Sequence, residues 1–228
     1  KWGADIKNID ESSSEIIAMN GNFHGRTLGS LSLSSQDSYK KGFGPLLNNI
    51  HYADFGDIEQ LKKLINNQTT AIILEPIQGE GGVNIPPTHF IQEVRQLCNE
   101  YNVLLIADEI QVGLGRTGKM FAMEWENTEP DIYLLGKSLG GGLYPISAVL
   151  ANQDVMSVLT PGTHGSTFGG NPLACAVSMA ALDVLNEEHL VQNALDLGDR
   201  LLKHLQQIES ELIVEVRGRG LFIGIELN

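Results

Sequence analysis

Cysteine is nearly absent from the sequence, with only Cys98 and Cys175 among 228 residues. Two cysteines in apolar surroundings cannot form the disulfide framework of a small secreted protein, and they do not have the clustered spacing of a zinc site. We therefore expect no metal and a reducing compartment, either the cytoplasm or, in a eukaryote, the mitochondrial matrix.

Positive charge is also scarce, since 15 lysines and arginines face 28 acidic residues and the formal net charge is −13. Nucleic-acid binding needs basic patches that neutralise phosphates, so a nucleic-acid partner is not expected. Apolar runs of the roughly 18 residues that a membrane-spanning helix requires are missing as well. The composition therefore favours a protein that acts on small molecules, and its acidity mildly favours a cationic substrate.

Two apolar runs that each lead to a reactive side chain are the most informative feature present. Residues 103–107 lead to Asp108, and residues 132–135 lead through Gly136 to Lys137. Short uninterrupted apolar runs are typical of strands buried on both faces of a parallel sheet. Because ligands bind at the carboxyl ends of such strands, we expect the acid and the lysine to lie side by side at that edge.

The chemistry of this pair suggests a cofactor. Burial favours the neutral form of a lysine, which is then a nucleophile towards carbonyl groups. A buried aspartate needs a cationic partner. Pyridoxal phosphate satisfies both requirements, because its aldehyde condenses with a lysine and its protonated ring nitrogen pairs with a carboxylate.

Two nucleotide-binding patterns compete with this interpretation. The stretch 136–138 has the Gly-Lys-Ser ending of a phosphate-binding loop, but Asp131 stands where that motif requires a glycine. The stretch 113–118 has the spacing of a dinucleotide-binding motif, but only 12 residues, Pro130 among them, separate it from Asp131, which directly precedes the next strand. The first pattern fails on residue type and the second on spacing. From these residues alone, a third interpretation stays open, in which Asp108 and Lys137 form ordinary ion pairs at the strand ends.

Three motifs in and around the pair resemble the class III, fold-type I aminotransferases: residues 108–118, 137–142 and 165–172. The resemblance follows the family's order through almost the whole chain. It implies an α/β fold, with a mostly parallel sheet flanked by helices, and pyridoxal phosphate as cofactor. Within the class, residues 22–27 and 142–145 are most similar to ornithine aminotransferases, and acetylornithine and 4-aminobutyrate aminotransferases are the alternatives.

The resemblance also implies a role for individual residues. Lys137 would bind the cofactor and act as catalytic acid and base, and Asp108 would keep the ring nitrogen protonated. Further cofactor contacts are implied for Gln111, Ile110, Phe23, Thr167 and Ser166. Substrate contacts are implied for Arg26, Glu80, Glu75 and Tyr144, and Glu80 would pair with a second active-site arginine when the substrate carries no distal carboxylate. For Phe23 and Glu75 a purely structural role is an equally good reading of the residues themselves.

The implied reaction moves the δ-amino group of ornithine to 2-oxoglutarate, giving glutamate semialdehyde and glutamate. Thr167 would reach the cofactor of a neighbouring subunit, so the family pattern implies a homodimer with shared active sites. Residues 1–188 would form the cofactor-binding domain and residues 189–228 the beginning of a small C-terminal domain. The family's phosphate-binding loop and second arginine are not found, so we expect an internal fragment that is inactive by itself; a non-catalytic piece is the alternative.

Hydrophobic periodicity predicts the elements. Strands are expected at 15–19, 70–74, 103–108, 132–135 and 146–151, helices at 57–66, 87–101, 173–187 and 190–209, a loop at 38–49, and a hairpin over 212–227 that turns about 217–220.

Overall fold

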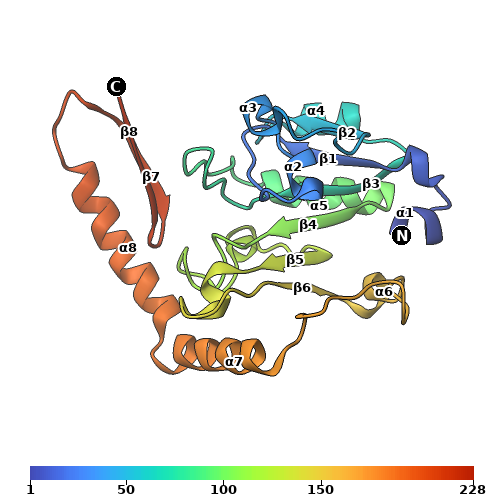
Figure 1. Cartoon of the computed structure of the whole chain (residues 1–228). Helices are drawn as coiled ribbons and strands as arrows, with labels where there is room; N and C mark the ends of the chain where they lie inside the picture. Colours follow the sequence, from blue (N-terminus) through green and yellow to red (C-terminus); the bar gives the residue numbers. More distant parts are fainter.

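A six-stranded sheet forms the centre of the computed structural model, which describes residues 1–228 (Figure 1). The strand order is β2-β1-β3-β4-β5-β6; β6 runs antiparallel to β5, and all other neighbours are parallel. The strands are β1 (Glu15–Met19), β2 (Ile50–Ala53), β3 (Thr69–Leu74), β4 (Leu104–Asp108), β5 (Ile132–Leu135) and β6 (Ala148–Ala151). The predicted α/β fold with a mostly parallel sheet is confirmed.

The main hydrophobic core lies between one face of this sheet and the helices α4 (Ile58–Leu64) and α5 (Phe90–Tyr101). Alternate strand residues point to the same face, so Ile72 and Leu74 of β3 and Leu105 of β4 all enter this core. The helix α5 contributes a stripe of apolar residues at helical spacing, namely Phe90, Ile91, Val94, Leu97 and Cys98. This core fixes the strands whose carboxyl ends carry the predicted site.

The opposite face of the sheet has a smaller core cluster, in which Ala71 and Leu104 meet Val155 and the partly buried Trp2. These contacts come from the short helices α1 (Trp2–Asp5) and α6 (Gln153–Met156). Three further single turns are 3₁₀ helices: η1 (Glu11–Ser13), η2 (Ala122–Glu126) and η3 (Lys137–Gly140).

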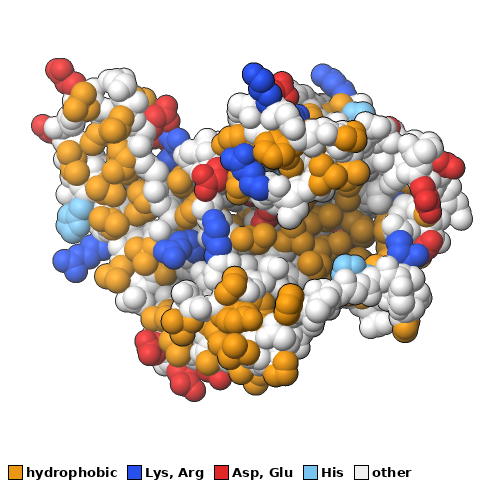
Figure 2. Space-filling model, in the orientation of Figure 1, with side chains coloured by type: hydrophobic (Ala, Val, Ile, Leu, Met, Phe, Trp, Pro, Cys, Tyr) orange, Lys and Arg blue, Asp and Glu red, His pale blue; other side chains and the backbone are white.

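The C-terminal part of the chain leaves the sheet through two long helices, α7 (Pro172–Glu187) and α8 (Leu190–Gln206) (Figure 1). Asn171 caps α7 by accepting a hydrogen bond from Ala174 N, and Pro172 occupies the first helical position, as helix starts favour. Apolar side chains gather over α7 at the lower edge of Figure 2. The exposed large apolar residues of this helix are Leu173, Met179 and Val184. No helix combines the length and hydrophobicity of a membrane span.

The strands β7 (Ile213–Arg219) and β8 (Phe222–Leu227) form a separate antiparallel sheet of two strands. This confirms the predicted hairpin, although its turn lies at Gly220 and Leu221, at the end of the predicted segment. The division of the chain at residue 188 stays a prediction.

Some element boundaries differ from the predictions. α5 begins at Phe90, three residues later than expected, because His89 has a left-handed backbone with φ 72°. The segment predicted as a loop begins with the short helix α3 (Asp37–Lys40), which follows α2 (Leu28–Ser32). The edge strand β2 was not predicted, since His51 and Tyr52 interrupt its apolar pattern.

Candidate active site

Asp108 and Lys137 follow neighbouring parallel strands and reach the same edge of the sheet. Asp108 is the last residue of β4 and lies opposite Leu134 of β5, and Lys137 follows Leu134 by three residues. Lys137 also lines a cavity of about 300 Å³ together with Gln111, Phe222 and three further residues, Arg116, Ser138 and Leu221. The structure thus places the expected lysine and glutamine on one cavity, and the expected acid at the end of the neighbouring strand.

Asp108 is 4% exposed, and its carboxylate has two hydrogen-bond donors. Its Oδ1 accepts from Ile110 N at 3.1 Å, and its Oδ2 lies 2.8 Å from His24 Nδ1. The His24 side chain is 2% exposed, and its Nε2 is buried with no hydrogen-bond partner. Since a carboxylate can only accept, His24 Nδ1 is the donor and orients the acid.

His24 was missed by the sequence analysis. A signal for it exists, because a buried aspartate requires a donor or cation, and His24 lies in the loop that follows β1, between Phe23 and Arg26. The side chain that would satisfy Asp108 could not be selected from the residues alone.

Lys137 has an unusual backbone. Its φ is 42°, in the left-handed region that costs a residue with a side chain about 1–2 kcal/mol, and such strained residues gather at functional sites. The Lys137 side chain is exposed, so the burial expected for this lysine from the sequence is not found. Gly136, directly before it, allows Ile110 to pack closely, since a Cβ at that position would lie 3.3 Å from Ile110 Cγ2. An exposed primary amine that follows one strand, and a buried, oriented carboxylate at the end of the neighbouring strand, suit pyridoxal phosphate.

Phe23 and Arg26 lie next to each other, with Tyr39 packed against both. The rings of Phe23 and Tyr39 meet edge to face with centroids 6.3 Å apart. The Arg26 guanidinium lies 4.0 Å from the Tyr39 centroid and 5.6 Å from that of Phe23. This cation–π contact holds an exposed guanidinium in place, where it can bind an anionic group.

Glu75 is largely buried and holds two loops together. Its Oε2 accepts a hydrogen bond from Phe23 N at 3.1 Å, and its Oε1 accepts one from Gly79 N at 3.2 Å. Burial raises the pKa of Glu75, while these two hydrogen bonds act in the opposite direction. The geometry therefore favours the structural alternative for Glu75 over the expected substrate contact.

Gln111 and Glu80 are neighbours at the same edge. Gln111 Nε2 donates to Glu80 Oε1 at 3.4 Å, and the Gln111 side chain occupies the space that a Cβ at residue 79 would need. Gly79 is therefore required for this contact. The exposed Glu80 carboxylate stands at the rim of the site, where it can meet a cationic group.

Three predicted residues are not tied to this cluster. Ser166 and Thr167 lie on the exposed segment between α6 and α7, and Ser166 Oγ accepts a hydrogen bond from Gly169 N at 3.0 Å. Tyr144 is half-buried after η3, and its backbone N donates to Gly140 O at 3.1 Å. The cofactor and substrate roles of these three residues stay predictions.

Glu109, next to Asp108, stabilises the chain behind the site. It is 1% exposed, and its carboxylate accepts hydrogen bonds from Ala122 N at 2.8 Å and Met123 N at 2.9 Å. Burial raises the pKa of Glu109 to about 7 despite these donors. Glu109 thus anchors the start of η2 to the end of β4.

Comparison with known proteins places this arrangement in a family. Residues 1–228 match the family described as aminotransferase class-III. The chain is 71% identical over all 228 residues to ornithine aminotransferase 1 of Staphylococcus aureus strain MRSA252. It covers 58% of that protein, so it spans less than two thirds of the length of this relative.

Solved structures agree in fold. Two structures of ornithine aminotransferase from Toxoplasma gondii are each 44% identical to this chain, with TM-scores of 0.97 and 0.96. Both alignments cover 100% of this chain, and they cover 55% and 54% of the Toxoplasma gondii chains. One of them is described as having partial occupancy of pyridoxal phosphate at its active site. An acetylornithine aminotransferase from Elizabethkingia anophelis is 40% identical, with a TM-score of 0.84 over 100% of this chain and 54% of its own. Since the family match spans every residue that forms the site, the chain belongs to the class III aminotransferases, a family of enzymes that depend on pyridoxal phosphate.

Proposed function

We propose that this protein transfers the δ-amino group of ornithine to 2-oxoglutarate, giving glutamate semialdehyde and glutamate, with pyridoxal phosphate as cofactor. The observation that carries this proposal is the 71% identity, over the whole chain, to an ornithine aminotransferase. The placement of Lys137 and Asp108 at neighbouring strand ends supports it.

The residues around Asp108 suit the ring of the cofactor. When bound, pyridoxal phosphate supplies an electron sink that stabilises negative charge on the carbon next to the substrate nitrogen. Asp108, oriented by Ile110 N and His24, would hold the ring nitrogen in its protonated form. Phe23 and Ile110 would cover the two faces of the ring, and Gln111 would donate a hydrogen bond at its edge.

Lys137 has two tasks in this proposal. Its exposed amine would bind the cofactor, and the same amine would take up and give back the proton that transamination moves. The left-handed backbone fixes the position from which the side chain leaves the sheet edge. Thr167 and Ser166 would serve the neighbouring subunit of a homodimer with shared active sites.

Charge selects the substrate in this proposal. Arg26, held by Tyr39, would bind the substrate carboxylate, and Glu80 would face the second ammonium group of a diamino acid. Ornithine carries two ammonium groups, whereas N-acetylornithine and 4-aminobutyrate carry one each. The Glu80 carboxylate therefore favours ornithine.

Acetylornithine aminotransferase is the second candidate function. The similarity to the Elizabethkingia anophelis structure supports it, because a protein described as an acetylornithine aminotransferase is 40% identical to this chain, with a TM-score of 0.84. The two functions differ in the charge of the substrate group that Glu80 would face. Kinetics with matched substrates separates them.

The experiment measures kcat/KM of the whole protein for ornithine, N-acetylornithine and 4-aminobutyrate, with 2-oxoglutarate as acceptor. We expect ornithine to be preferred by at least about tenfold, which corresponds to about 1.4 kcal/mol. The Glu80→Gln variant should lower kcat/KM for ornithine more than that for 4-aminobutyrate. A preference for N-acetylornithine would establish the second candidate, and no transamination of any of the three would refute both.

A further inference from the structure

The loop that carries Glu80 is fixed firmly at its base. Gln78 and Asn84 form an isolated antiparallel bridge, with N–O distances of 3.0 and 2.9 Å. The Gln78 side chain, 1% exposed, donates to Asn20 O at 2.7 Å and accepts from Asn84 Nδ2 at 3.1 Å. The base of the loop is thereby attached to the end of β1, which leaves the tip at 79–83 to be positioned by other contacts.

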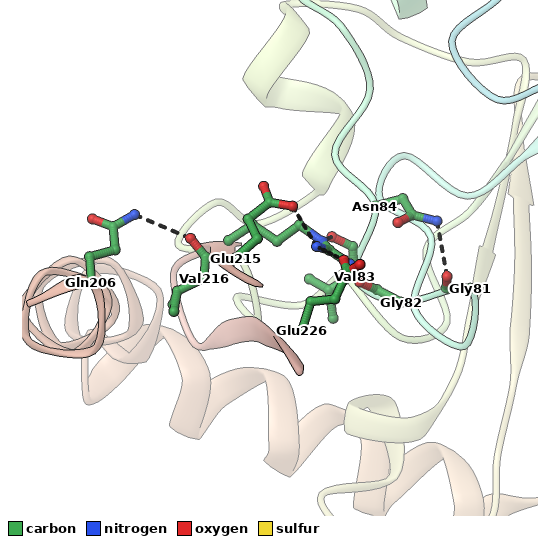
Figure 3. Close-up of polar contacts among 9 residues, drawn as sticks. Gly81, Gly82, Val83, Asn84, Gln206, Glu215, Val216 and Glu226 are labelled. Carbon is green, nitrogen blue, oxygen red and sulfur yellow. Dashed lines mark hydrogen bonds and ion pairs between the residues drawn. The ribbon is translucent and has the colours of Figure 1, made fainter. Parts of the chain in front are cut away.

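An arginine of the C-terminal hairpin holds that tip. Arg217, on β7, donates from Nη2 to Gly82 O at 2.7 Å, and from Nε to Gly82 O at 3.1 Å and Val83 O at 3.3 Å. Figure 3 shows the loop residues from Gly81 to Asn84 beside the hairpin residues Glu215 and Glu226. These contacts join parts of the chain that are 134 and 135 positions apart.

The other side of the Arg217 guanidinium binds two carboxylates. Its Nη1 lies 2.6 Å from Glu215 Oε2 and 2.6 Å from Glu226 Oε2. These two glutamates are directly opposite each other in the hairpin, a placement that destabilises strand pairs unless a cation lies between them. The rigid, five-donor fork of an arginine can bind carbonyls and carboxylates at once, which the compact ammonium of a lysine cannot do.

The hairpin is also shaped to receive the loop. Gly224 lies opposite Arg217, and a Cβ there would come within 3.0 Å of Val83 Cβ. Phe222 of the hairpin packs with Val83 against the buried residues Ile77, Val112 and Ala122. Polar and apolar contacts from the hairpin therefore reach the loop tip, and both Gln111 and Phe222 lie against its first residue, Gly79.

We propose that Arg217 is a positioning residue, which fixes the loop tip and thereby the Glu80 carboxylate beside Gln111. Through this contact the C-terminal hairpin takes part in recognising the amine substrate. The inference rests on the proposed function, since Glu80 acts on the substrate only if the site performs transamination. The contact itself can be tested without any activity.

The structural test compares Arg217→Lys with Arg219→Lys in the whole protein. Arg219 lies on the same strand, but its guanidinium faces Trp125, 4.9 Å away, and Glu126, 4.0 Å away, instead of the loop. Hydrogen exchange measured by mass spectrometry should show that the backbone amides of residues 79–84 exchange at least about tenfold faster in Arg217→Lys. A tenfold change corresponds to the loss of about 1.4 kcal/mol of hydrogen bonding. Exchange should stay unchanged in Arg219→Lys. Equal exchange in both variants would refute the contact, whatever the enzyme's activity.

The kinetic test separates positioning from general stability. Arg217→Lys should raise KM for ornithine about tenfold and leave KM for 2-oxoglutarate within about twofold, because Glu80 is displaced from the amine substrate alone. In the Glu80→Gln background the Arg217→Lys substitution should have almost no effect on KM for ornithine, because Arg217 acts on the substrate only by positioning the Glu80 carboxylate. Equal losses for both substrates, or additive effects in the double variant, would overturn the proposal.

Discussion

His24 offers the sharpest test of how this site stabilises its acid. In the His24→Leu variant, Asp108 Oδ2 loses the donor that lies 2.8 Å away, in surroundings where the histidine side chain is 2% exposed and that of the acid 5%. A hydrogen bond to a charged group contributes about 1.5–3 kcal/mol, and water has little access to replace it. Since about 1.4 kcal/mol is a factor of ten in rate, we expect kcat for ornithine to fall about 10- to 100-fold.

The matched control is His24→Asn, whose side-chain amide can donate from nearly the same place as Nδ1. This variant should keep kcat within a few-fold of the wild type. Steady-state kinetics at saturating ornithine and 2-oxoglutarate, with circular dichroism to verify folding, measures both variants. An unchanged kcat in His24→Leu, or equal losses in both folded variants, would refute the reasoning that the hydrogen bond to Asp108 serves catalysis.

The remaining predictions concern pH, packing and thiol reactivity. Burial raises the pKa of Glu109 to about 7, above its unfolded value, so the folded state holds a proton that the unfolded state releases. The free energy of unfolding should therefore fall by about 3 kcal/mol as the pH rises from 4.5 to 7. Urea unfolding at several pH values should show a smaller fall in Glu109→Gln, and an equal fall would refute this. Tyr39→Leu should release Arg26, which would bind the substrate carboxylate, and so raise KM for ornithine about 2- to 5-fold. Tyr39→Phe keeps an aromatic ring and should leave this KM unchanged. Identical KM values in both variants would count against the cation–π contact. Burial raises the pKa of the Cys98 thiol to about 12, so Cys98 should stay unlabelled by iodoacetamide at pH 8 in the native protein and react after denaturation; native labelling would contradict its place in the core.

Much of the fold follows from local pattern. The strands β3, β4 and β5 were predicted because each is a short apolar run, and their parallel order places Asp108 and Lys137 at one edge. The edge strand β2 was not predicted, because an edge position tolerates the half-exposed His51 and Tyr52. Local pattern thus reveals strands that are uninterrupted apolar runs and misses an edge strand whose run is broken by polar residues.

The site was predictable only where its chemistry is visible in single residues. Lysine and aspartate at strand ends indicate their function directly, and the family motifs added Gln111 and Arg26. His24 was missed because its partner lies 84 positions away, and no periodicity reports a contact of that kind. For the same reason the sequence left two interpretations of Glu75 open. The structural one is favoured by two backbone donors, the distant Phe23 N and the nearby Gly79 N.

Covalent labelling of the cofactor-binding lysine tests the central claim most directly. The whole protein is incubated with pyridoxal phosphate, reduced with borohydride, digested and mapped by mass spectrometry. The account predicts a pyridoxyl group on Lys137, at the end of β5, and no label at that peptide in Lys137→Ala. A stoichiometric label on Lys119 or Lys203 instead, or none on any lysine, would contradict it.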